Sequence, residues 1–360
     1  MSIKSPDMDP IHGSDLSDRE RLVLEAVIRT YVETAEPAGS RNVARRHSFG
    51  VAPATVRNTM SDLEEKGYLF HPHTSAGRIP TDTAYRVFVD HLMHPARITV
   101  AERERLVQEL DLESSSGVER LVRRTTRALS LLCMELGVAV APRLGEAVLE
   151  RLDLMQVSQQ KVLLVATIQS GFVRTVYVDL PGDVPSDTLV TLTLILNERL
   201  AGLTLQEIRD TLPARLRDSG SEELPGSDEL LNIFMQSGAE LFDPPGDGDS
   251  HVHLGIASVL ANQPEFNSGE RLKGLIELTE ERGLLAEVLG GRDHQAGGLQ
   301  ITIGGEHSEL RLSDFTLVTS EYRLGGMKGV IGVIGPTRMP YEKVVAIVDY
   351  TTTLINQILE

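Results

Sequence analysis

Cysteine is nearly absent from this chain of 360 residues, in which Cys133 is the single example. One cysteine excludes an intrachain disulfide and a metal cluster built on several thiolates. Long hydrophobic runs are absent as well, since no apolar stretch reaches the ~18 residues of a membrane span, and the first residues are polar and acidic. We therefore expect a cytoplasmic protein that makes no membrane contact. Within the apolar run LSLLCMEL, Cys133 is predicted to be a small core residue.

Negative charge exceeds positive charge over the chain as a whole, with 52 Asp or Glu against 35 Lys or Arg, but one stretch has the opposite balance. The net charge is −17, but residues 39–86 contain seven Lys or Arg and four Asp or Glu, a local 7 − 4 = +3. The remainder then carries −17 − 3 = −20. Such asymmetry indicates one anion-binding module joined to an acidic bulk that a phosphate backbone would repel.

Residues 16–65 show the spacing of three consecutive helices. Ser17 followed by Glu20 is a capping box, and the first helix is expected to end before Pro37. A second helix is expected over 40–46, then a turn at SFGVA, and a third helix whose first turn contains Pro53. In the third helix an apolar stripe at i, i+4 and i+7 is predicted to be buried. Its members are Val56, Met60 and Leu63.

The opposite side of the third helix carries side chains of the types that recognition helices present to DNA bases. Asn58 suits bidentate pairing with adenine and Arg57 with guanine, each contributing roughly 1–3 kcal/mol of discrimination, while Thr55 suits a thymine methyl or a phosphate. Ser40 and Arg41 open the second helix, where side chains and N–H groups commonly hold phosphate. An ordinary solvated helix face remains the alternative, and it is the better interpretation for an isolated helix. Three helices followed by a wing favour DNA recognition.

A wing is predicted after the third helix. Residues 68–70 and 78–80 suit two short strands around a turn. Side chains at its tip are expected to meet phosphates or the minor groove, namely His73, Thr74, Ser75 and Arg78. The HPH sequence brings two histidines together but lacks a third ligand nearby, so no metal site is expected.

No catalytic motif emerges from the rest of the chain. Two glycine-rich stretches, 303–309 and 325–336, match neither a P-loop nor a dinucleotide fingerprint, and we interpret them as turns and strands. Acidic residues and histidines are scattered without the spacing of nucleophilic or metal chemistry. We therefore predict a protein that is not an enzyme and needs no cofactor.

Two long blocks of sequence resemble a known family. The stretch PAGSRNVARRHSFGVAPATVRNTMSDLEEKGYLFHPHTSAGRIPTDTAYRVFVD is similar to the N-terminal domain of the bacterial heat-inducible transcription repressor HrcA family. LQITIGGEHSELRLSDFTLVTSEYRLGGMKGVIGVIGPTRMPYEKVVAIVDY resembles its C-terminal block, and ANQPEF is a shorter third match. The chain departs from the family at AEPA, where many relatives have GEPV. It also has Thr59 where an acidic residue is common, a change that would alter the charge near the DNA.

The resemblance implies a multidomain α+β protein with a winged helix-turn-helix, a GAF-like α/β sensor domain and an inserted, mainly helical dimerisation domain. It further implies a homodimer that binds an inverted-repeat operator in double-stranded DNA and represses chaperone and chaperonin operons until heat stress. The chaperonin is implied as a modulator. The alternative function is a metabolite-sensing winged-helix regulator with a ligand in the GAF-like domain.

The segments between the matched blocks suggest how these domains divide the chain. Helices are expected over 82–91, 101–112, 118–136 and 341–359, and strands over 137–142, 152–157, 161–168, 171–180, 299–303 and 315–320. Residues 1–14 are predicted to be disordered, and 15–96 to form the DNA-binding domain. Residues 97–204 and 295–360 are assigned to the GAF-like domain, and 205–294 to the inserted dimerisation domain.

Overall fold

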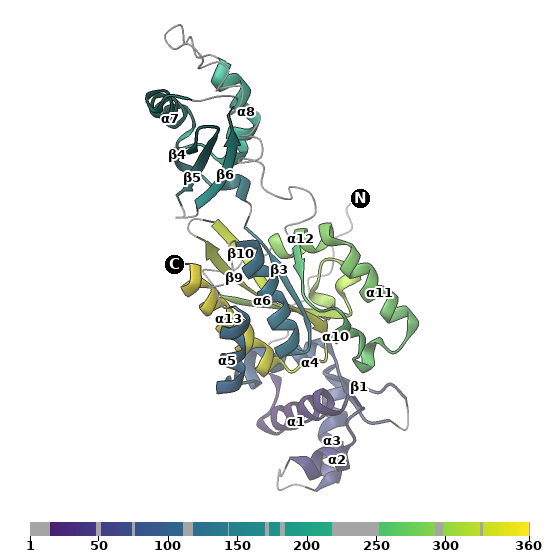
Figure 1. Cartoon of the computed structure of the whole chain (residues 1–360). Coiled ribbons are helices and arrows are strands. Elements are labelled where there is room, and N and C mark those ends of the chain that lie inside the picture. The colour runs from purple at the N-terminus through teal and green to yellow at the C-terminus, as the bar shows by residue number, and fades with distance from the viewer. Residues whose placement is uncertain are drawn as a thin grey trace, which may run out of the picture.

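The computed structural model describes ten stretches of the chain, separated by gaps of which the longest is residues 218–251. They are residues 15–47, 52–73, 76–110, 118–142, 144–169, 173–180, 184–217, 252–291, 298–324 and 327–359. Three parts follow one another along an elongated molecule (Figure 1): an N-terminal unit, residues 15–92; a central body, residues 96–142 and 252–359; and a three-stranded unit, residues 144–217. The predicted mixture of helices and sheets in an α+β protein is confirmed. The predicted disorder of residues 1–14 lies outside the described residues.

The N-terminal unit begins with three helices, α1 (Asp18–Thr34), α2 (Ser40–Arg46) and α3 (Pro53–Glu65). The capping box is present, because the Ser17 side chain accepts from the Glu20 N–H while the Glu20 carboxylate accepts from the Ser17 N–H at 2.8 Å. Two short antiparallel strands follow, β1 (Leu69–Phe70) and β2 (Ile79–Pro80), and then α4 (Asp82–Val87) and the π-helical turn η2 (Phe88–Leu92). The three predicted helices and the paired strands after them are confirmed.

The central body is built on a five-stranded antiparallel sheet. Its strands are β7 (Val252–Leu254), β3 (Leu136–Val140), β10 (Met327–Pro336), β9 (Phe315–Leu324) and β8 (Leu299–Ile303), in that spatial order. The chain reaches β7 and β8 only after long excursions from β3. The sheet is therefore assembled from segments far apart in sequence.

Helices cover both faces of this sheet (Figure 1). On one face lie α6 (Val118–Cys133) and α13 (Tyr341–Leu359), with α5 (Val100–Glu109) against α6. On the other lie α10 (Ser258–Ala261), η5 (Pro264–Phe266), α11 (Gly269–Glu280) and α12 (Arg282–Gly290). Short 3-10 turns, η7 (Gly304–Glu306) and η8 (Leu310–Leu312), connect β8 to β9. The predicted final helix is confirmed, and Cys133 is buried as expected.

The three-stranded unit has a sheet and a hydrophobic core of its own. It contains the turn η4 (Leu144–Glu146), the sheet β4 (Leu149–Ser158), β5 (Lys161–Ile168) and β6 (Val173–Asp179), and the helices α7 (Ser186–Leu200) and α8 (Leu205–Arg217). Alternate residues of β5 are buried among α7 and α8, for example Val162 and Leu164. This grouping differs from the expected one, in which these strands joined residues 295–360 in one domain.

The region expected to form a separate helical insertion also packs differently. Residues 252–290 contribute β7 to the five-stranded sheet and cover one of its faces with α10, α11 and α12. Residues 218–251 and 292–297 lie outside the described residues. The expectation was wrong on this grouping because periodicity identifies a strand or helix but not the element it pairs with.

Glycines of β10 allow close contacts between neighbouring strands. A Cβ on Gly329 would lie 2.4 Å from the ring of Tyr322, and one on Gly332 would lie 2.1 Å from the carbonyl oxygen of Val318. A Cβ on Gly335 would lie 2.1 Å from a carboxylate oxygen of Glu135. The glycine-rich stretch is therefore part of a buried strand, as predicted, and not a phosphate-binding loop.

Glu135 is a buried carboxyl group at the start of β3. Burial raises its pKa well above the usual 4.5, against the lowering effect of a hydrogen bond from Gln263. Between the usual and the raised pKa, the unfolded chain releases a proton that the folded protein keeps. The free energy of unfolding therefore falls as pH rises through this window.

Replacing Glu135 by glutamine removes this penalty and keeps an oxygen that accepts from Gln263. We expect Tm to rise by roughly 2–8 °C at pH 8, at ~2–4 °C for each kcal/mol, with a smaller gain at pH 5. Differential scanning calorimetry at both pH values measures the effect, with Glu104→Gln on exposed α5 as the control. An equal gain at pH 5 and pH 8 would refute the argument.

No helix in the described part of the chain is both long enough and apolar enough to cross a membrane.

Candidate nucleic-acid interface

The exposed face of α3 carries the predicted base-reading side chains. Arg57 and Asn58 are exposed, and Thr55 is partly exposed. In the described stretches neither Arg57 nor Asn58 makes a side-chain hydrogen bond or ion pair, so both groups are available to a partner. The predicted stripe on the opposite side is confirmed as buried, with Val56, Met60 and Leu63 at most 3% exposed.

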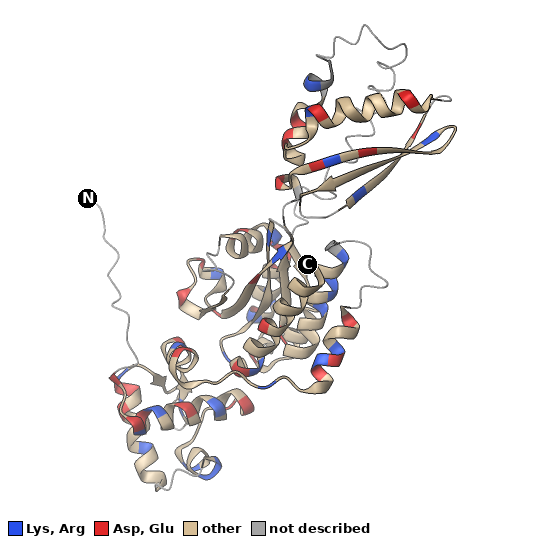
Figure 2. Cartoon of the chain, turned by 90° about the vertical axis from the view of Figure 1, so that its left-hand side faces the viewer, with Lys and Arg blue, Asp and Glu red and all other residues tan. Residues whose placement is uncertain are grey.

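This face lies at one end of the molecule. Figure 1 places α2 and α3 farthest from the three-stranded unit, and Figure 2 shows Lys and Arg positions at the same end. A long partner can therefore lie across α2 and α3 without meeting the acidic bulk of the chain. The geometry fits a rod-shaped polyanion.

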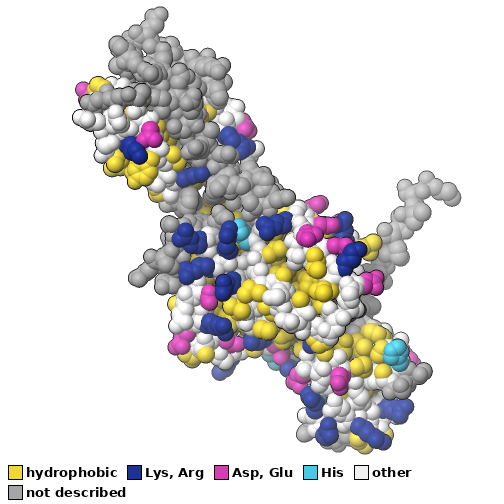
Figure 3. Space-filling model, turned by 45° about the vertical axis from the view of Figure 1, so that its right-hand side comes forward, with side chains coloured by type: hydrophobic (Ala, Val, Ile, Leu, Met, Phe, Trp, Pro, Cys, Tyr) yellow, Lys and Arg dark blue, Asp and Glu magenta, His cyan; other side chains and the backbone are white. Residues whose placement is uncertain are grey.

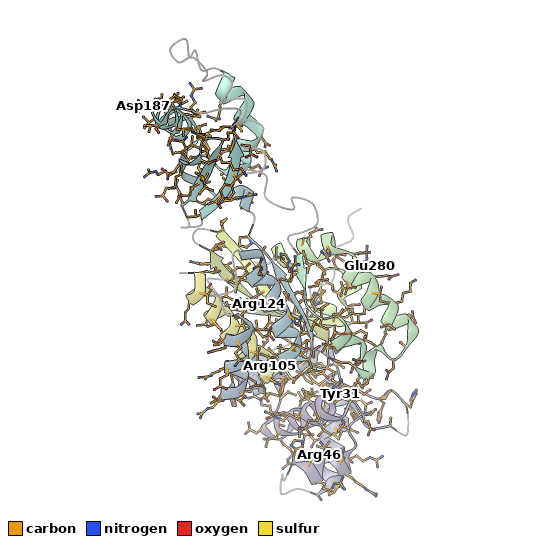
Figure 4. All side chains as sticks on the ribbon, in the orientation of Figure 1. Tyr31, Arg46, Arg105, Arg124, Asp187 and Glu280 are labelled. Carbon is orange, nitrogen blue, oxygen red and sulfur yellow. The ribbon has the colours of Figure 1, made fainter. Side chains whose placement is uncertain are left out.

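Helix α2 brings further polar groups beside α3. Ser40 is the first helical residue and is half-buried, whereas Arg41 is exposed. Arg45, which the sequence did not single out, is also exposed on α2. Arg46, labelled at the same end in Figure 4, is held by Glu33 of α1 at 2.6 Å.

Thr59 does not lie on the exposed face. Its side chain is 5% exposed and its hydroxyl donates to the carbonyl oxygen of Thr55 at 3.2 Å. The expectation that this residue changes the charge near DNA was wrong, because the side chain points into the N-terminal core.

The residues predicted at the wing tip fall into three groups. His73 is exposed, and Thr74 and Ser75 lie outside the described residues. Arg78 is different, because its side chain is only 12% exposed and its guanidinium contacts Glu64 of α3 at 2.8 Å. The structure does not bring Arg78 onto the exposed surface with Arg57 and Asn58.

Glu64 fastens both strands of the wing to α3. One carboxylate oxygen contacts the Nδ1 of His71 at 2.7 Å, and the other contacts Arg78. Arg78 also lies near the Ser61 hydroxyl at 3.5 Å. A single carboxylate of α3 thus contacts a residue beside each of the two strands.

Replacing Glu64 by glutamine leaves the largely buried Arg78 without its ionic partner. We expect the free energy of unfolding to fall by about 1–2 kcal/mol, less than for a fully buried pair because Glu64 is partly solvated. Thermal unfolding followed by circular dichroism measures the loss. Glu65→Gln, at the exposed neighbouring position, is the control, and equal behaviour of the two variants would remove the role assigned to Glu64.

The N-terminal unit is docked on the central body by charged side chains. Both terminal nitrogens of Arg29 on α1 donate to the carboxylate of Glu342 on α13, at 2.8 and 2.7 Å. The same guanidinium lies 5.8 Å from the ring centroid of Phe88. Burial alone would lower the pKa of Arg29, but the hydrogen bonds to Glu342 and Glu25 raise it, so the cation is secured at this contact.

A second contact joins α4 to the end of β8. Arg86 donates to Glu306 at 2.7 Å and to the carbonyl oxygen of Ile301 at 2.8 Å. The hydrogen bond with Glu306 raises the pKa of Arg86, against the lowering effect of burial. Asp82 accepts from the N–H of Gly305 at 2.9 Å, where a Cβ on the preceding Gly304 would collide with the carboxylate.

A third contact uses the ANQPEF motif. Glu265 forms a bidentate ion pair with Arg338, which also donates to the carbonyl oxygen of Val32 at 2.7 Å. In the same motif, the Gln263 amide donates to the carbonyl oxygen of Met134 at 2.7 Å. The motif therefore ties the turn before β3 to the turn before α13, and Arg338 in the latter turn contacts α1.

These three contacts form one continuous junction with a shared hydrophobic core. Residues of α1, α4, β9 and α13 pack in a single cluster, in which the rings of Tyr85 and Tyr341 lie 5.6 Å apart. Sequence reasoning missed all of these residues. No local signal marks them, because Arg29 and Glu342 are separated by 313 positions and Arg86 and Glu306 by 220.

Among the residues that the structure describes, no group of three or more His, Cys, Asp or Glu side chains is arranged to hold a metal ion. The exposed face of α3 is therefore interpreted from its side chains alone, which are chiefly Arg57 and Asn58.

Three short helices with an exposed amide and guanidinium face, followed by a fastened two-stranded ribbon, are typical of DNA-binding transcription regulators. The comparisons with known proteins agree with that class. The sequence profile described as "HrcA protein C terminal domain" matches residues 119–345. A heat-inducible transcription repressor HrcA of Chlorobium phaeobacteroides is 37% identical over 353 residues, covering 96% of this chain and 99% of the relative.

Its counterpart from Geobacter sulfurreducens is 36% identical, again covering 96% of this chain and 99% of the relative. A crystal structure described as a hypothetical protein has a TM-score of 0.66 at 20% identity and covers 96% of this chain and 98% of its own, which supports the fold. The chain belongs to the heat-inducible transcription repressor HrcA family.

Proposed function

We propose that the N-terminal unit is a winged helix-turn-helix and that α3 enters the major groove of double-stranded DNA. The observation that carries this proposal is the face of α3, where Arg57 and Asn58 are exposed without partners in the described residues and stand opposite a buried stripe. Thr55 borders the same face, and Ser40 and Arg41 at the start of α2 are suited to neighbouring phosphates. His73 and the wing-tip residues Thr74 and Ser75 remain predicted backbone or minor-groove contacts.

We assign Arg78 to positioning of the wing and not to phosphate binding. Its guanidinium is paired with Glu64 and is largely buried. Arg78→Ala should therefore weaken DNA binding by loosening the wing, while the slope of affinity against salt concentration stays that of the wild type. A reduced slope would instead indicate that Arg78 contacts a phosphate, as the sequence predicted.

The protein is proposed to bind an inverted-repeat operator as a homodimer, formed through the three-stranded unit. One face of its sheet packs on α7 and α8, but no described helix or strand covers the other. Strand register places Met155, Leu163 and Tyr177 in one row across the open face, where Met155 is 57% and Tyr177 is 65% exposed. A second copy would cover these apolar side chains. We therefore propose dimerisation through residues 144–217 instead of through residues 205–294, the segment that the sequence favoured.

The regulatory role is proposed to be repression of chaperone and chaperonin operons until heat stress. Relatives in the family are named heat-inducible transcription repressors. We propose that the central body, as a GAF-like domain, holds the DNA-binding unit in its working orientation through the Arg29, Arg86 and Arg338 contacts. Heating loosens this junction or the dimer, and affinity falls because both half-sites must be held together. A chaperonin is the proposed modulator.

The alternative is a metabolite sensor with its ligand in the GAF-like domain. Apolar side chains of α10 to α12, including Leu260, Leu285 and Leu289, pack against one face of the sheet and are fully buried. A ligand at that face would have to displace them. The observations therefore favour repression without an internal ligand at the sheet.

A footprint on a chaperonin promoter tests the proposal. Purified protein is titrated with and without purified chaperonin between 25 and 50 °C, and protection of both arms of an inverted repeat is expected at the lower temperatures only. In the presence of chaperonin, protection of the operator should appear at a lower concentration of the purified protein. Protection of no discrete site, or of a single arm, would contradict operator binding by a dimer.

A further inference from the structure

A cleft opens between the N-terminal unit and the central body beside the junction. Its volume is about 840 Å³, within the range of pockets that hold ligands. One wall comes from α1, the wing and α4, and the other from η5, α11 and the start of β9. In Figure 4, Tyr31 is labelled where α1 meets the body, and Figure 3 shows hydrophobic side chains on the N-terminal unit next to the body.

Aromatic side chains are concentrated in this cleft. Five of the chain's 15 aromatic residues, seven Tyr and eight Phe in all, line it. They are Tyr31, Phe70, Tyr85, Phe266 and Phe315. The Phe70 side chain is 44% exposed, an unusual state for a phenylalanine beside a core. The walls can therefore take up an apolar side chain of a ligand.

Some charged side chains of the cleft form ion pairs within the protein, and others do not. Arg338 is taken up by Glu265, and Arg311 is paired with Glu281. In contrast, the exposed side chains of Glu270, Arg271 and Asp314 make no ion pair or hydrogen bond within the described residues. The rim thus offers two carboxylates and one guanidinium to a ligand that carries both signs of charge.

Tyr85 adds a buried donor without a partner. Its side chain is 1% exposed, and its hydroxyl has no hydrogen-bond partner in the described structure. An unpaired buried hydroxyl costs free energy, which a carbonyl oxygen of a ligand would recover. The donor lies in the wall next to the aromatic side chains.

We propose that this cleft binds a short extended peptide with an aromatic side chain between charges of opposite sign. The aromatic group packs on Phe70 and the half-buried Tyr31, the charges meet the rim, and a backbone carbonyl accepts from Tyr85. Four acids against three arginines line the cleft, so a phosphate-rich ligand is disfavoured. Because the peptide contacts both walls, binding fixes the N-terminal unit relative to the body.

Gly274 allows a test that leaves the walls intact. It lies on α11 facing the cleft, and a Cβ there would meet no heavy atom within 4 Å. Gly274→Trp should direct an indole ring into the cleft from a position where the Cβ itself meets no neighbour. Gly290 of α12 has equally open surroundings and does not line the cleft, so Gly290→Trp is the matched control.

The probes are fluorescein-labelled hexapeptides with a central Phe-Phe, Tyr-Tyr or Leu-Leu pair between one lysine and one glutamate. Fluorescence anisotropy follows their binding to the full chain without DNA, so the result is independent of operator recognition. We expect saturable micromolar binding of at least one peptide, weakened at least tenfold by Gly274→Trp and unchanged by Gly290→Trp.

Three outcomes would overturn the proposal. They are no saturable binding of any of the peptides, equal affinity of the two tryptophan variants, and complete displacement by equimolar free L-phenylalanine, which would identify an amino-acid site instead. Circular dichroism confirms that both variants are folded before the titrations are compared.

Discussion

Replacing Arg57 or Asn58 by alanine is expected to weaken DNA binding by about 1–3 kcal/mol in each half-site, which is roughly 5- to 150-fold per half-site. Both side chains are exposed on α3 and have no partner in the described residues, so the loss comes from contacts with DNA and not from the fold. Each substitution should also relax the preference for one base pair in each half-site.

Electrophoretic mobility shifts on the operator and on single-base variants measure both effects. Arg105→Ala and Gln108→Ala, on the exposed side of α5 in the central body, remove the same kinds of group far from the proposed interface. Wild-type affinity and sequence preference in the α3 variants would show that α3 does not read the bases. A uniform loss over all DNA sequences would reassign Arg57 to phosphate contact.

The double substitution Met155→Glu and Tyr177→Glu is expected to convert the proposed dimer to a monomer. Both side chains are more than half exposed on the open face of the three-stranded sheet, and two carboxylates there would be buried unpaired in a dimer. Since simultaneous binding of two half-sites multiplies affinity, operator binding should fall by about 10²- to 10⁴-fold. Sedimentation velocity at micromolar concentration reports the oligomeric state directly.

Exposed apolar side chains on α7 offer a second surface on which a copy of the chain could pack, and a variant there distinguishes the two. Val190 and Leu194 lie one turn apart on α7 and are 60% and 66% exposed. Val190→Glu with Leu194→Glu should leave the dimer intact. If this pair dissociates the dimer and the sheet pair does not, the second copy packs on α7 and the assignment of the sheet face is wrong.

Features predicted correctly from the sequence depend on neighbouring residues. The Ser17 and Glu20 cap, the buried stripe of α3 and the final helix from Tyr341 each arise within a few turns of chain. Their signals are contained in local spacing, so the helices and the base-reading face could be proposed without coordinates.

Features that the sequence did not reveal depend on pairing over long distances. Strands such as β5 alternate like any half-buried strand, and nothing in that pattern says which sheet they join. The partner of Arg78 is a second example, because an arginine beside a wing turn is equally compatible with phosphate and with Glu64. Only packing decides between those two roles.

The contact between Arg29 and Glu342 joins α1 to α13, the first and the last helix among the described residues. During translation the N-terminal unit is therefore synthesised long before the helix on which it docks. Chains that stop before α13 would carry the base-reading face without its support. On the proposed function, a chain truncated before α13 should therefore bind operator more weakly than one that contains this helix.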